Sequence, residues 1–183
     1  MRLFLSFFMA VCLSLASPLS AQAEDGFAKN IALVSESVTV PSEPIRYADG
    51  REGSLNDFGG EVLVVTLWQE HCPFCRREMP VLNELAQQME GQGVRVVALG
   101  LDQDMGVIQN YLQRIAPNIE PIMDVDLING SIFSIEHFGR LSIATPTTFI
   151  INKQGNVAAT AWGLVDWTGD DAKNYLLGLA AQG

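Results

Sequence analysis

The sequence has few cysteines and few basic residues, and each shortage excludes a class of protein. Three cysteines in 183 residues are too few for a disulfide-dense miniprotein. Eleven basic residues against 21 acidic ones leave a net charge of -10, which argues against nucleic acid or an anionic membrane surface as the main partner. A hydrophobic content of 48% excludes collagen and low-complexity disorder. The length suits one compact domain with a sizeable core.

The sequence also lacks a long apolar run after its N-terminus. Arg2 is the one charge before Glu24, and it is followed by a largely apolar stretch over residues 3–16 and by Ala21-Gln22-Ala23. This order predicts a secretory signal peptide over residues 1–23. A retained membrane anchor is the alternative, although 14 residues fall short of the roughly 20 that span a bilayer.

Cleavage after Ala23 would change the cysteine count and the charge. It removes Arg2 and Cys12, so that residues 24–183 keep a net charge of -11 and one cysteine pair. We therefore expect the mature protein in an oxidising compartment where disulfides persist, the periplasm of a Gram-negative bacterium.

The remaining chain alternates between strand and helix patterns. Apolar runs at 62–68 and 94–99 predict strands buried on both faces. Apolar spacing predicts a long helix that ends before Gly91, then helices near 107–115, 130–138 and 172–180. Turn residues predict hairpins at 45–55 and 148–160. We predict an N-terminal extension over residues 24–44, with a short strand at 38–40, and one α/β domain over 45–183.

The segment Cys72-Pro73-Phe74-Cys75 lies where the first buried strand ends and the long helix begins. Backbone N–H groups and the dipole at a helix N-terminus stabilise negative charge, so the pKa of the Cys72 thiol should fall from about 8.5 to roughly 3.5–7.5. Pro73 suits the first turn because its missing N–H would be unpaired there. The spacing places Cys75 on the same helical face, within reach of a disulfide.

A disulfide that closes so short a loop constrains the unfolded chain little, which makes a purely structural role a poor explanation. A reversible dithiol–disulfide couple explains the placement better: Cys72 would attack a partner's disulfide, and Cys75 would resolve the mixed disulfide.

Three other interpretations of the cysteine pair stay open. A structural zinc site needs four ligands, for which the pair and the two histidines, His71 and His137, are a poor set. Inert buried cysteines would leave the strand-to-helix placement unexplained. Copper handling is favoured more, because Cys72, Cys75, His71 and Met79 are soft or borderline ligands close together in the sequence.

The residues around the pair carry weaker signals. Glu78 lies one helical turn after the second cysteine, where its carboxylate would raise thiol pKa values or carry a proton; a solvated surface acid is the equal alternative. Trp68 is expected to pack as a wall of the site. His71 either tunes the thiolate or is an exposed side chain without a role, and Arg76 and Arg77 are expected to form a solvated face.

Thr145-Pro146 precedes the apolar residues 147–151 and is a candidate cis peptide bond. A proline at the start of a strand also has an ordinary structural explanation.

Together these segments resemble a known family. Residues 68–80 resemble the W-x-x-x-C-x-x-C-x-x-E-x-P signature of TlpA/ResA-type thioredoxin-like proteins, whose domain is of the AhpC/TSA–redoxin type. Residues 145–152 resemble their cis-proline strand, residues 152–155 the following hairpin, and Gly163 the glycine after the last strand. The resemblance covers the chain from about residue 45 to the C-terminus.

The resemblance implies a thioredoxin-like fold, in which helices flank a central mixed β-sheet, with an N-terminal β-hairpin extension. It implies that Cys72 is the nucleophile and Cys75 the resolving thiol of a Cys72–Cys75 redox disulfide. It implies that Glu78 is the active-site glutamate.

The resemblance also implies where a substrate binds. Pro146 would be the cis-proline that faces the disulfide, and the backbone of Thr145 would pair with bound substrate. We expect the neighbouring side chains of Trp68, Pro73 and Phe74 to complete the substrate-binding surface.

The sequence departs from the family pattern at several points. Phe74 replaces a common second proline, and Thr66 stands where thioredoxins keep a buried aspartate. His71 stands where tryptophan is frequent. The Gly-Val-x-x-x-Pro-Glu-type loop of dedicated cytochrome c reductases is absent before Pro146.

We therefore expect a monomeric, periplasmic thiol–disulfide oxidoreductase with no dissociable cofactor and no metal. It would reduce disulfides of client proteins in cytochrome c maturation or copper-centre assembly, with electrons from a membrane thiol donor. We expect no nucleic-acid partner and no stable membrane insertion after cleavage. The alternatives are an oxidant that introduces disulfides, a copper-binding or copper-delivery module that uses the same cysteines, and a redox-inactive interaction domain.

Overall fold

Among the residues that the structure describes, eight strands form one mixed sheet. The computed structural model describes residues 27–34, 38–139, 141 and 143–182, so the predicted signal segment lies outside them. The strands are β1 (Ile31–Leu33), β2 (Ile45–Tyr47), β3 (Glu52–Gly53), β4 (Val62–Trp68), β5 (Val94–Gly100), β6 (Pro121–Asp124), β7 (Thr147–Ile151) and β8 (Val157–Trp162). The helices are α1 (Pro73–Gln88), α2 (Met105–Ile115), α3 (Ile128–Phe138) and α4 (Asp170–Ala180), with short 3-10 helices at Ala28–Asn30, Leu55–Phe58 and Val125–Leu127.

The strand order is β1-β8-β7-β4-β5-β6-β2-β3. β4 runs parallel to β5 and antiparallel to β7, so the end of β4 meets the end of β5 and the start of β7 at one edge of the sheet. In the register, Trp68 pairs with Gly100 and Leu67 pairs with Thr147. This edge brings the segment after β4 and the segment before β7 together.

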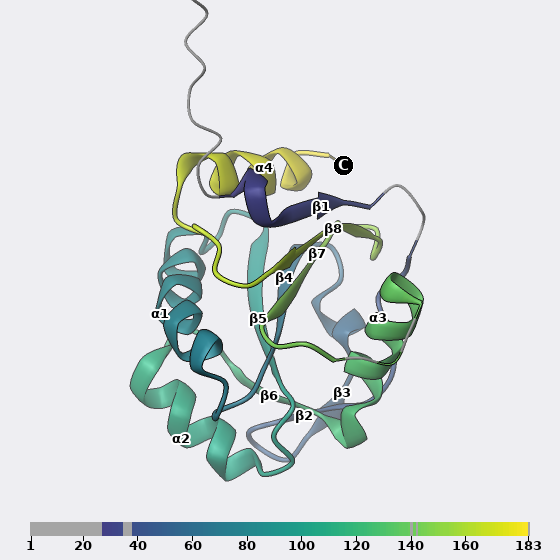
Figure 1. Ribbon diagram of the computed structural model, residues 1–183, viewed down its shortest axis with the longest axis vertical. Helices are drawn as coiled ribbons and strands as arrows, with labels where there is room; N and C mark the ends of the chain where they lie inside the picture. Colours follow the sequence, from purple (N-terminus) through teal and green to yellow (C-terminus); the bar gives the residue numbers. More distant parts are fainter. Residues whose placement is uncertain (1–26, 35–37, 140, 142, 183) are drawn as a thin grey trace, which may run out of the picture.

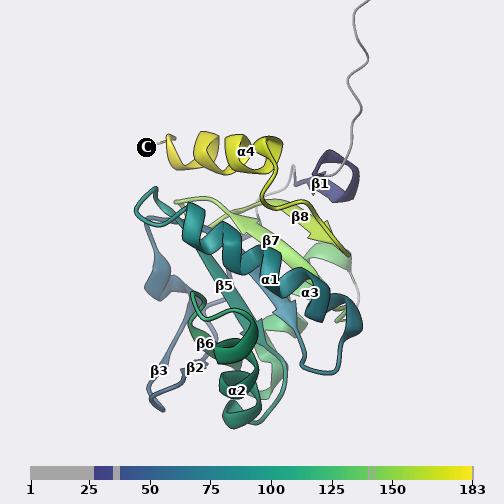
Figure 2. The same cartoon turned by 90° about the vertical axis from the view of Figure 1, so that its left-hand side faces the viewer.

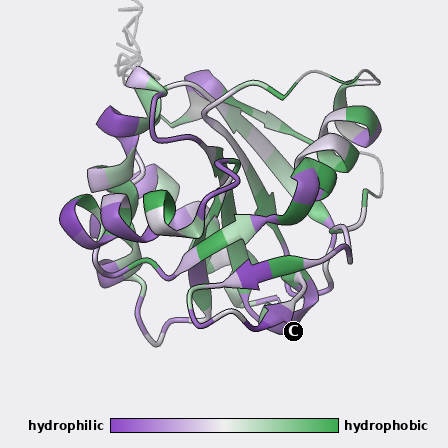
Figure 3. Cartoon of the chain, turned by 90° about the horizontal axis from the view of Figure 1, so that it is seen from below, coloured by the Kyte–Doolittle hydropathy of each residue, from purple (hydrophilic) through white to green (hydrophobic). Residues whose placement is uncertain are grey.

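Helices cover both faces of the sheet, which is why β4 is buried along its whole length. α1, α2 and α4 pack on one face, and α3 with the 3-10 helix at Leu55–Phe58 packs on the other. Figure 1 places α3 across the sheet from α1 and α2, and Figure 2 shows α1 and α2 in front of the strands. The inner strands are hydrophobic and much of the outer helix surface is hydrophilic (Figure 3).

The predicted α/β architecture with a mixed sheet is confirmed. The two buried strands, the long helix after β4 and both hairpins form as predicted. The second helix ends at Ile115, with Ala116 as its C-cap, before Pro117.

The segment before residue 45 differs from the prediction. The predicted strand at 38–40 is reduced to a single bridge between Thr39 and Asn156. The strand in this region is instead β1, whose register with β8 pairs Ile31 with Ala161 and Leu33 with Ala159. Its three residues carry no alternating pattern, so only pairing with β8 defines the strand.

Candidate active site

The long helix starts at the cysteine pair because its first turn is capped by Cys72. Cys72 has extended backbone angles, φ -75 and ψ 114, and Pro73 occupies the first helical turn. The Cys75 N–H donates to Cys72 Sγ at 3.1 Å, which satisfies one of the backbone donors that a helix start leaves free. The two sulfurs form a disulfide between Cα atoms 5.2 Å apart.

The two cysteines differ in exposure. Cys72 is half-buried, whereas only 1% of Cys75 is exposed. An approaching disulfide therefore reaches the Cys72 sulfur first. This asymmetry fits Cys72 as the attacking thiol and Cys75 as the internal one.

Thr145 and Pro146 lie across from the disulfide. The Thr145–Pro146 peptide bond is cis, as predicted. Thr145 O lies 3.5 Å from Cys72 Sγ, although 73 residues separate the two in the sequence. Pro146 is buried and Thr145 is half-buried, so backbone of this segment borders the reactive sulfur.

Glu78 is buried, which contradicts the alternative of a solvated surface acid. Only 2% of the residue is exposed, and its Oε1 accepts a 2.8 Å hydrogen bond from Trp167 Nε1. Its Oε2 is buried and has no hydrogen-bond partner among the described residues. Burial raises the pKa of Glu78 to about 7, against the smaller opposite effect of the Trp167 hydrogen bond.

Trp167 is a site residue that the sequence reasoning missed. It is fully buried in the connection between β8 and α4, 89 residues after Glu78. The Phe27 ring packs edge-on against it with centroids 5.9 Å apart. The one available signal was a tryptophan in an otherwise polar, glycine-containing segment, which does not indicate a carboxylate as its partner.

Trp68 does not contribute to an exposed substrate surface. It is fully buried, and its ring packs against Tyr111 with centroids 5.1 Å apart. A side chain that is closed to solvent cannot contact a client protein, so the substrate-binding prediction is wrong for Trp68 and the prediction of a packing wall is confirmed. Pro73 is exposed and Phe74 is 54% exposed beside Cys72, so both are accessible to a client.

The soft or borderline ligands proposed for copper differ in their exposure to solvent. The His71 side chain is 86% exposed, with Nδ1 3.7 Å from Glu70 Oε2. Met79 is buried in the core between α1 and the sheet. Within the described part of the chain, no group of three or more histidine, cysteine or acidic side chains is arranged to hold a metal ion.

Thr66 stands where thioredoxins keep a buried aspartate. It is fully buried on β4, and its Oγ1 has no partner among the described residues. Glu78 and Asp124 are the buried carboxylates of the described chain. Asp124 accepts backbone hydrogen bonds from Asn129 and Gly130 at the start of α3, so Glu78 is the acid available to the cysteines.

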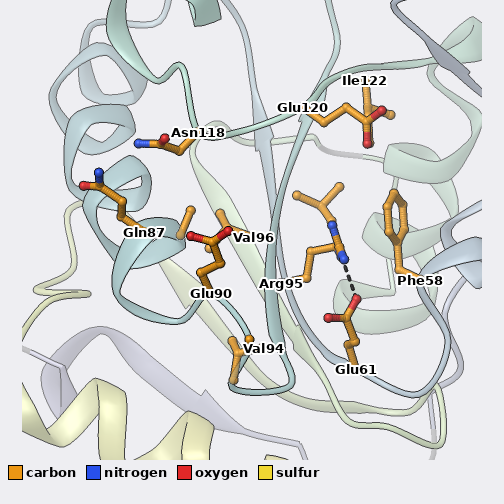
Figure 4. A pocket seen from close by; sticks show the side chains of 13 residues that line it. Phe58, Glu61, Gln87, Glu90, Val94, Arg95, Val96, Asn118, Glu120 and Ile122 are labelled. Atoms are coloured by element: carbon orange, nitrogen blue, oxygen red, sulfur yellow. Dashed lines mark hydrogen bonds and ion pairs between the residues drawn. The ribbon is translucent and has the colours of Figure 1, made fainter.

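A separate hollow of about 300 Å³ lies at the far end of the parallel strands from the disulfide. Figure 4 shows Gln87 and Glu90 on one side of it and Glu61 joined to Arg95 on the other. It borders the start of β5, whereas the cysteines follow the end of β4. This hollow is therefore no part of the redox site.

Comparisons with known proteins agree with this geometry. The model of the AhpC/TSA family matches residues 37–160. Thiol-disulfide oxidoreductase ResA of Geobacillus thermodenitrificans is 28% identical over 138 residues, which are 75% of this chain and 74% of that protein. ResA of Bacillus subtilis is 23% identical over 71% of this chain and 69% of its own length.

Solved structures with similar folds include a putative thiol:disulfide interchange protein and a putative thioredoxin. A putative thiol:disulfide interchange protein DsbE from Chlorobium tepidum has a TM-score of 0.66 at 20% identity, over 81% of this chain and 99% of that one. A putative thioredoxin from Neisseria meningitidis has a TM-score of 0.64 at 22% identity, over 80% of this chain and 94% of that one. These likenesses confirm the predicted thioredoxin-like fold.

The described ranges of the chain contain no membrane-spanning helix. None of the helices there combines the length and the apolar character needed to cross a bilayer.

Proposed function

Since the chain belongs to the AhpC/TSA family and is a thiol–disulfide oxidoreductase, we propose that it is a periplasmic reductant of protein disulfides. The observation that carries the proposal is the Cys72–Cys75 disulfide at the start of α1, with Cys72 accessible beside the cis Thr145–Pro146 bond and Cys75 buried one helical turn before the buried Glu78.

The first step is attack by the Cys72 thiolate on one sulfur of a client disulfide. The Cys72–client disulfide forms as the client's S–S bond breaks, and one client sulfur leaves as a thiolate that takes up a proton. The helix N-terminus stabilises the negative charge of the attacking thiolate. The Thr145 backbone, beside Cys72, is placed to pair with the client chain.

The second step needs a proton acceptor for the buried Cys75 thiol. Glu78 lies one helical turn after Cys75, and its Oε2 is unpartnered among the described residues. The carboxylate takes the Cys75 proton, and the resulting thiolate attacks Cys72 Sγ. The Cys72–Cys75 disulfide forms, the second client sulfur leaves and takes a proton, and two electrons have passed to the client.

Exposed apolar side chains lie between the two cysteines and near the start of β7, and they offer a surface for the client. They are Phe74, Phe138 and Trp162. Trp162 pairs across the sheet with Thr147, and Phe138 lies with Ala144 and Thr147 around a small crevice. Such a surface suits an extended client segment better than a small polar substrate.

The proposal includes export and re-reduction. Residues 1–23 act as a cleaved signal peptide, residues 24–44 form the extension, and residues 45–183 form the thioredoxin-like domain of a monomer. A membrane thiol donor returns the electrons, and the clients are proteins of cytochrome c maturation or copper-centre assembly.

Trapping tests the proposal. Cys75→Ser leaves Cys72 able to attack but unable to be released, so client proteins should accumulate as mixed disulfides that dithiothreitol dissolves. Cys72→Ser, with the buried thiol alone, is the matched control and should trap little. No trapped species with Cys75→Ser under oxidising extraction would contradict exchange chemistry.

The reduction potential against glutathione tests the direction. A reduction potential of about -270 mV would support a role as a reductant, whereas a potential of about -120 mV would make the protein an oxidant.

A further inference from the structure

A second hollow lies between α2 and the N-terminal part of α1. Its volume is about 390 Å³, and the residues that line it are Glu70, Arg76, Tyr111, Arg114 and Ile115. Arg76 follows Cys75 in the sequence, and its backbone N–H donates to Cys72 O at 3.2 Å. One residue that lines the hollow therefore directly follows the reactive pair in the sequence and is bonded through its backbone to Cys72.

The two arginines of this hollow have no carboxylate partner among the described residues. Arg46, Arg51 and Arg95, by contrast, each form an ion pair with a nearby acid. Each arginine of the hollow is anchored through Nε alone, Arg76 to Glu70 O at 2.8 Å and Arg114 to Asn110 O at 3.0 Å. The terminal nitrogens of both guanidinium groups are left as free donors.

Tyr111 adds a third free donor. Only 5% of the residue is exposed, because its ring packs on Trp68, and its hydroxyl has no hydrogen-bond partner within the described part of the chain. Burial raises the pKa of Tyr111, Glu70 adds to this rise, and Arg76 and Arg114 oppose it, so the hydroxyl lies near two cations and one carboxylate. Glu70 is the one acid that lines the hollow, so the two guanidinium groups leave it positive.

We propose that this hollow binds a carboxylate side chain of the client protein, so that clients with an acidic residue close to the reactive disulfide are preferred. The inference rests on the proposed function and names a feature of its clients. Two planar guanidinium forks and a hydroxyl match the oxygens of one carboxylate.

Local contacts must produce this preference, because the long-range field opposes it. The chain carries a net charge of -10 and repels an acidic client at a distance. Once a client carboxylate lies in the hollow, charge-assisted hydrogen bonds from Arg76 and Arg114 outweigh this repulsion. The hollow would therefore select clients by the position of the acidic residue relative to the reactive cysteine as well as by its charge.

The test uses peptides with an internal disulfide and measures the second-order rate constant of their single-turnover reduction by the full-length reduced protein. One Glu is moved through the three positions on either side of a cysteine, and Gln replaces it in the paired peptide. At one or two positions, the Glu peptide should be reduced about 3- to 10-fold faster than its Gln partner at low salt. This ratio should shrink as salt is added.

Variants distinguish binding in the hollow from a general effect of positive charge on acidic peptides. The double variant Arg76→Gln/Arg114→Gln should bring the ratio close to one, and Tyr111→Phe should lower it. Arg77→Gln removes one charge from the adjacent position of α1, which does not line the hollow, and should keep the preference. Measuring the Gln peptides with each variant corrects for any change in folding or in the chemistry.

Several outcomes would overturn the inference. A ratio near one at every position, a preference that survives the double variant, or an equal loss in Arg77→Gln each contradicts a client carboxylate in the hollow. If acetate shifts the Arg76 and Arg114 NMR signals while no peptide is preferred, the hollow binds small anions and the client inference fails. Trapping by Cys75→Ser is unaffected in all these cases, so the proposed function is tested separately.

Discussion

The burial of the Glu78 side chain sets its proton affinity, on which its proposed role at the redox site depends. Its carboxylate holds one hydrogen bond from Trp167 and leaves the other oxygen unpartnered among the described residues. A pKa of about 7 means that both protonation states are populated near neutral pH, which suits a group that takes a proton from Cys75 and later returns it. The same burial makes the ionised form costly to the folded protein.

This burial predicts a pH dependence of stability. The pKa of Glu78 rises from 4.5 to about 7 on folding, so the unfolded chain releases this proton first as pH increases. The buried, protonated Glu78 therefore contributes fully to stability below about pH 4.5, and this contribution is lost as pH rises to about 7. Over this range the free energy of unfolding should fall by about 3 kcal/mol. Urea unfolding of the oxidised protein between these pH values measures it.

Glu78→Gln is the control for this dependence, because it keeps the shape and cannot ionise. Its free energy of unfolding should fall less steeply over the same pH range than that of the wild type. Parallel curves for the two proteins would contradict a buried, titrating Glu78.

Trp167 is expected to tune the proton affinity of Glu78. Trp167→Phe keeps an aromatic ring and removes the Nε1 donor, which takes away the contact that lowers the pKa of Glu78. The pH midpoint for release of a Cys72-linked peptide should rise by about one unit. Stopped-flow measurement of that release across pH gives the midpoint.

The double variant Glu78→Gln/Trp167→Phe shows whether Trp167 acts through the carboxylate. In the Glu78→Gln background, Trp167→Phe should shift the pH profile no further. An equal shift in both backgrounds would mean that Trp167 acts only through packing.

At the scale of elements, side chains that accept backbone N–H groups hold the first turns of two helices in place. α1 begins at a cysteine whose sulfur accepts a backbone N–H, and the first turn of α3 donates backbone N–H groups to a buried acid that precedes the helix, Asp124. Asp124 is fully buried at the end of β6 and accepts from Asn129 N, Asn129 Nδ2 and Gly130 N. Between Asp124 and α3, Asp126 and Leu127 both have positive φ, a backbone conformation that the surrounding contacts must maintain.

Asp124→Ala is expected to destabilise the protein by about 2–4 kcal/mol, because it leaves buried N–H donors without partners. Asp104→Ala removes a comparable cap at the exposed start of α2, where Asp104 Oδ1 accepts from Gly106 N at 2.8 Å. Water replaces that partner, so the expected loss is about 0.5–1 kcal/mol. Urea unfolding at one pH compares the two; equal losses would contradict the buried role of Asp124.

At the scale of the whole molecule, the sheet joins the N-terminal part of the chain to the redox site. β1 pairs with β8, and Phe27 packs on Trp167, which in turn binds Glu78. Phe27, which lies close to the predicted cleavage site, therefore contacts the tryptophan that donates a hydrogen bond to Glu78. Export would leave this arrangement intact, since cleavage after Ala23 precedes Phe27.

The export prediction concerns the whole chain and has a direct measurement. Protein purified from the periplasm of a Gram-negative host should begin at Glu24, contain 160 residues and lack Cys12. Intact-mass spectrometry should find two cysteine thiols after reduction. A mass that retains residues 1–23 would favour the alternative of an anchor.

Local signals were enough to predict much of the site. Buried strands, the helix start at Cys72-Pro73 and the cis bond at Pro146 depend on neighbouring residues, and the structure contains all of them. β1 was missed, because its pattern is too short to indicate a strand. The choice for Glu78 between a solvated and a buried acid stayed open, because helical spacing places a residue on a face without saying what packs against it.

The sequence by itself determined the reactive pair, its place at a helix N-terminus and the family to which it points, since these depend on residues within a few positions of one another. Only the tertiary structure decided that Glu78 is buried against Trp167, 89 residues away, and that Thr145 lies beside Cys72, 73 residues away. It also decided that two arginines from different helices share one hollow. Burial, and with it a pKa or a free hydrogen-bond donor, depends on contacts between distant segments, which exist only once the chain has folded.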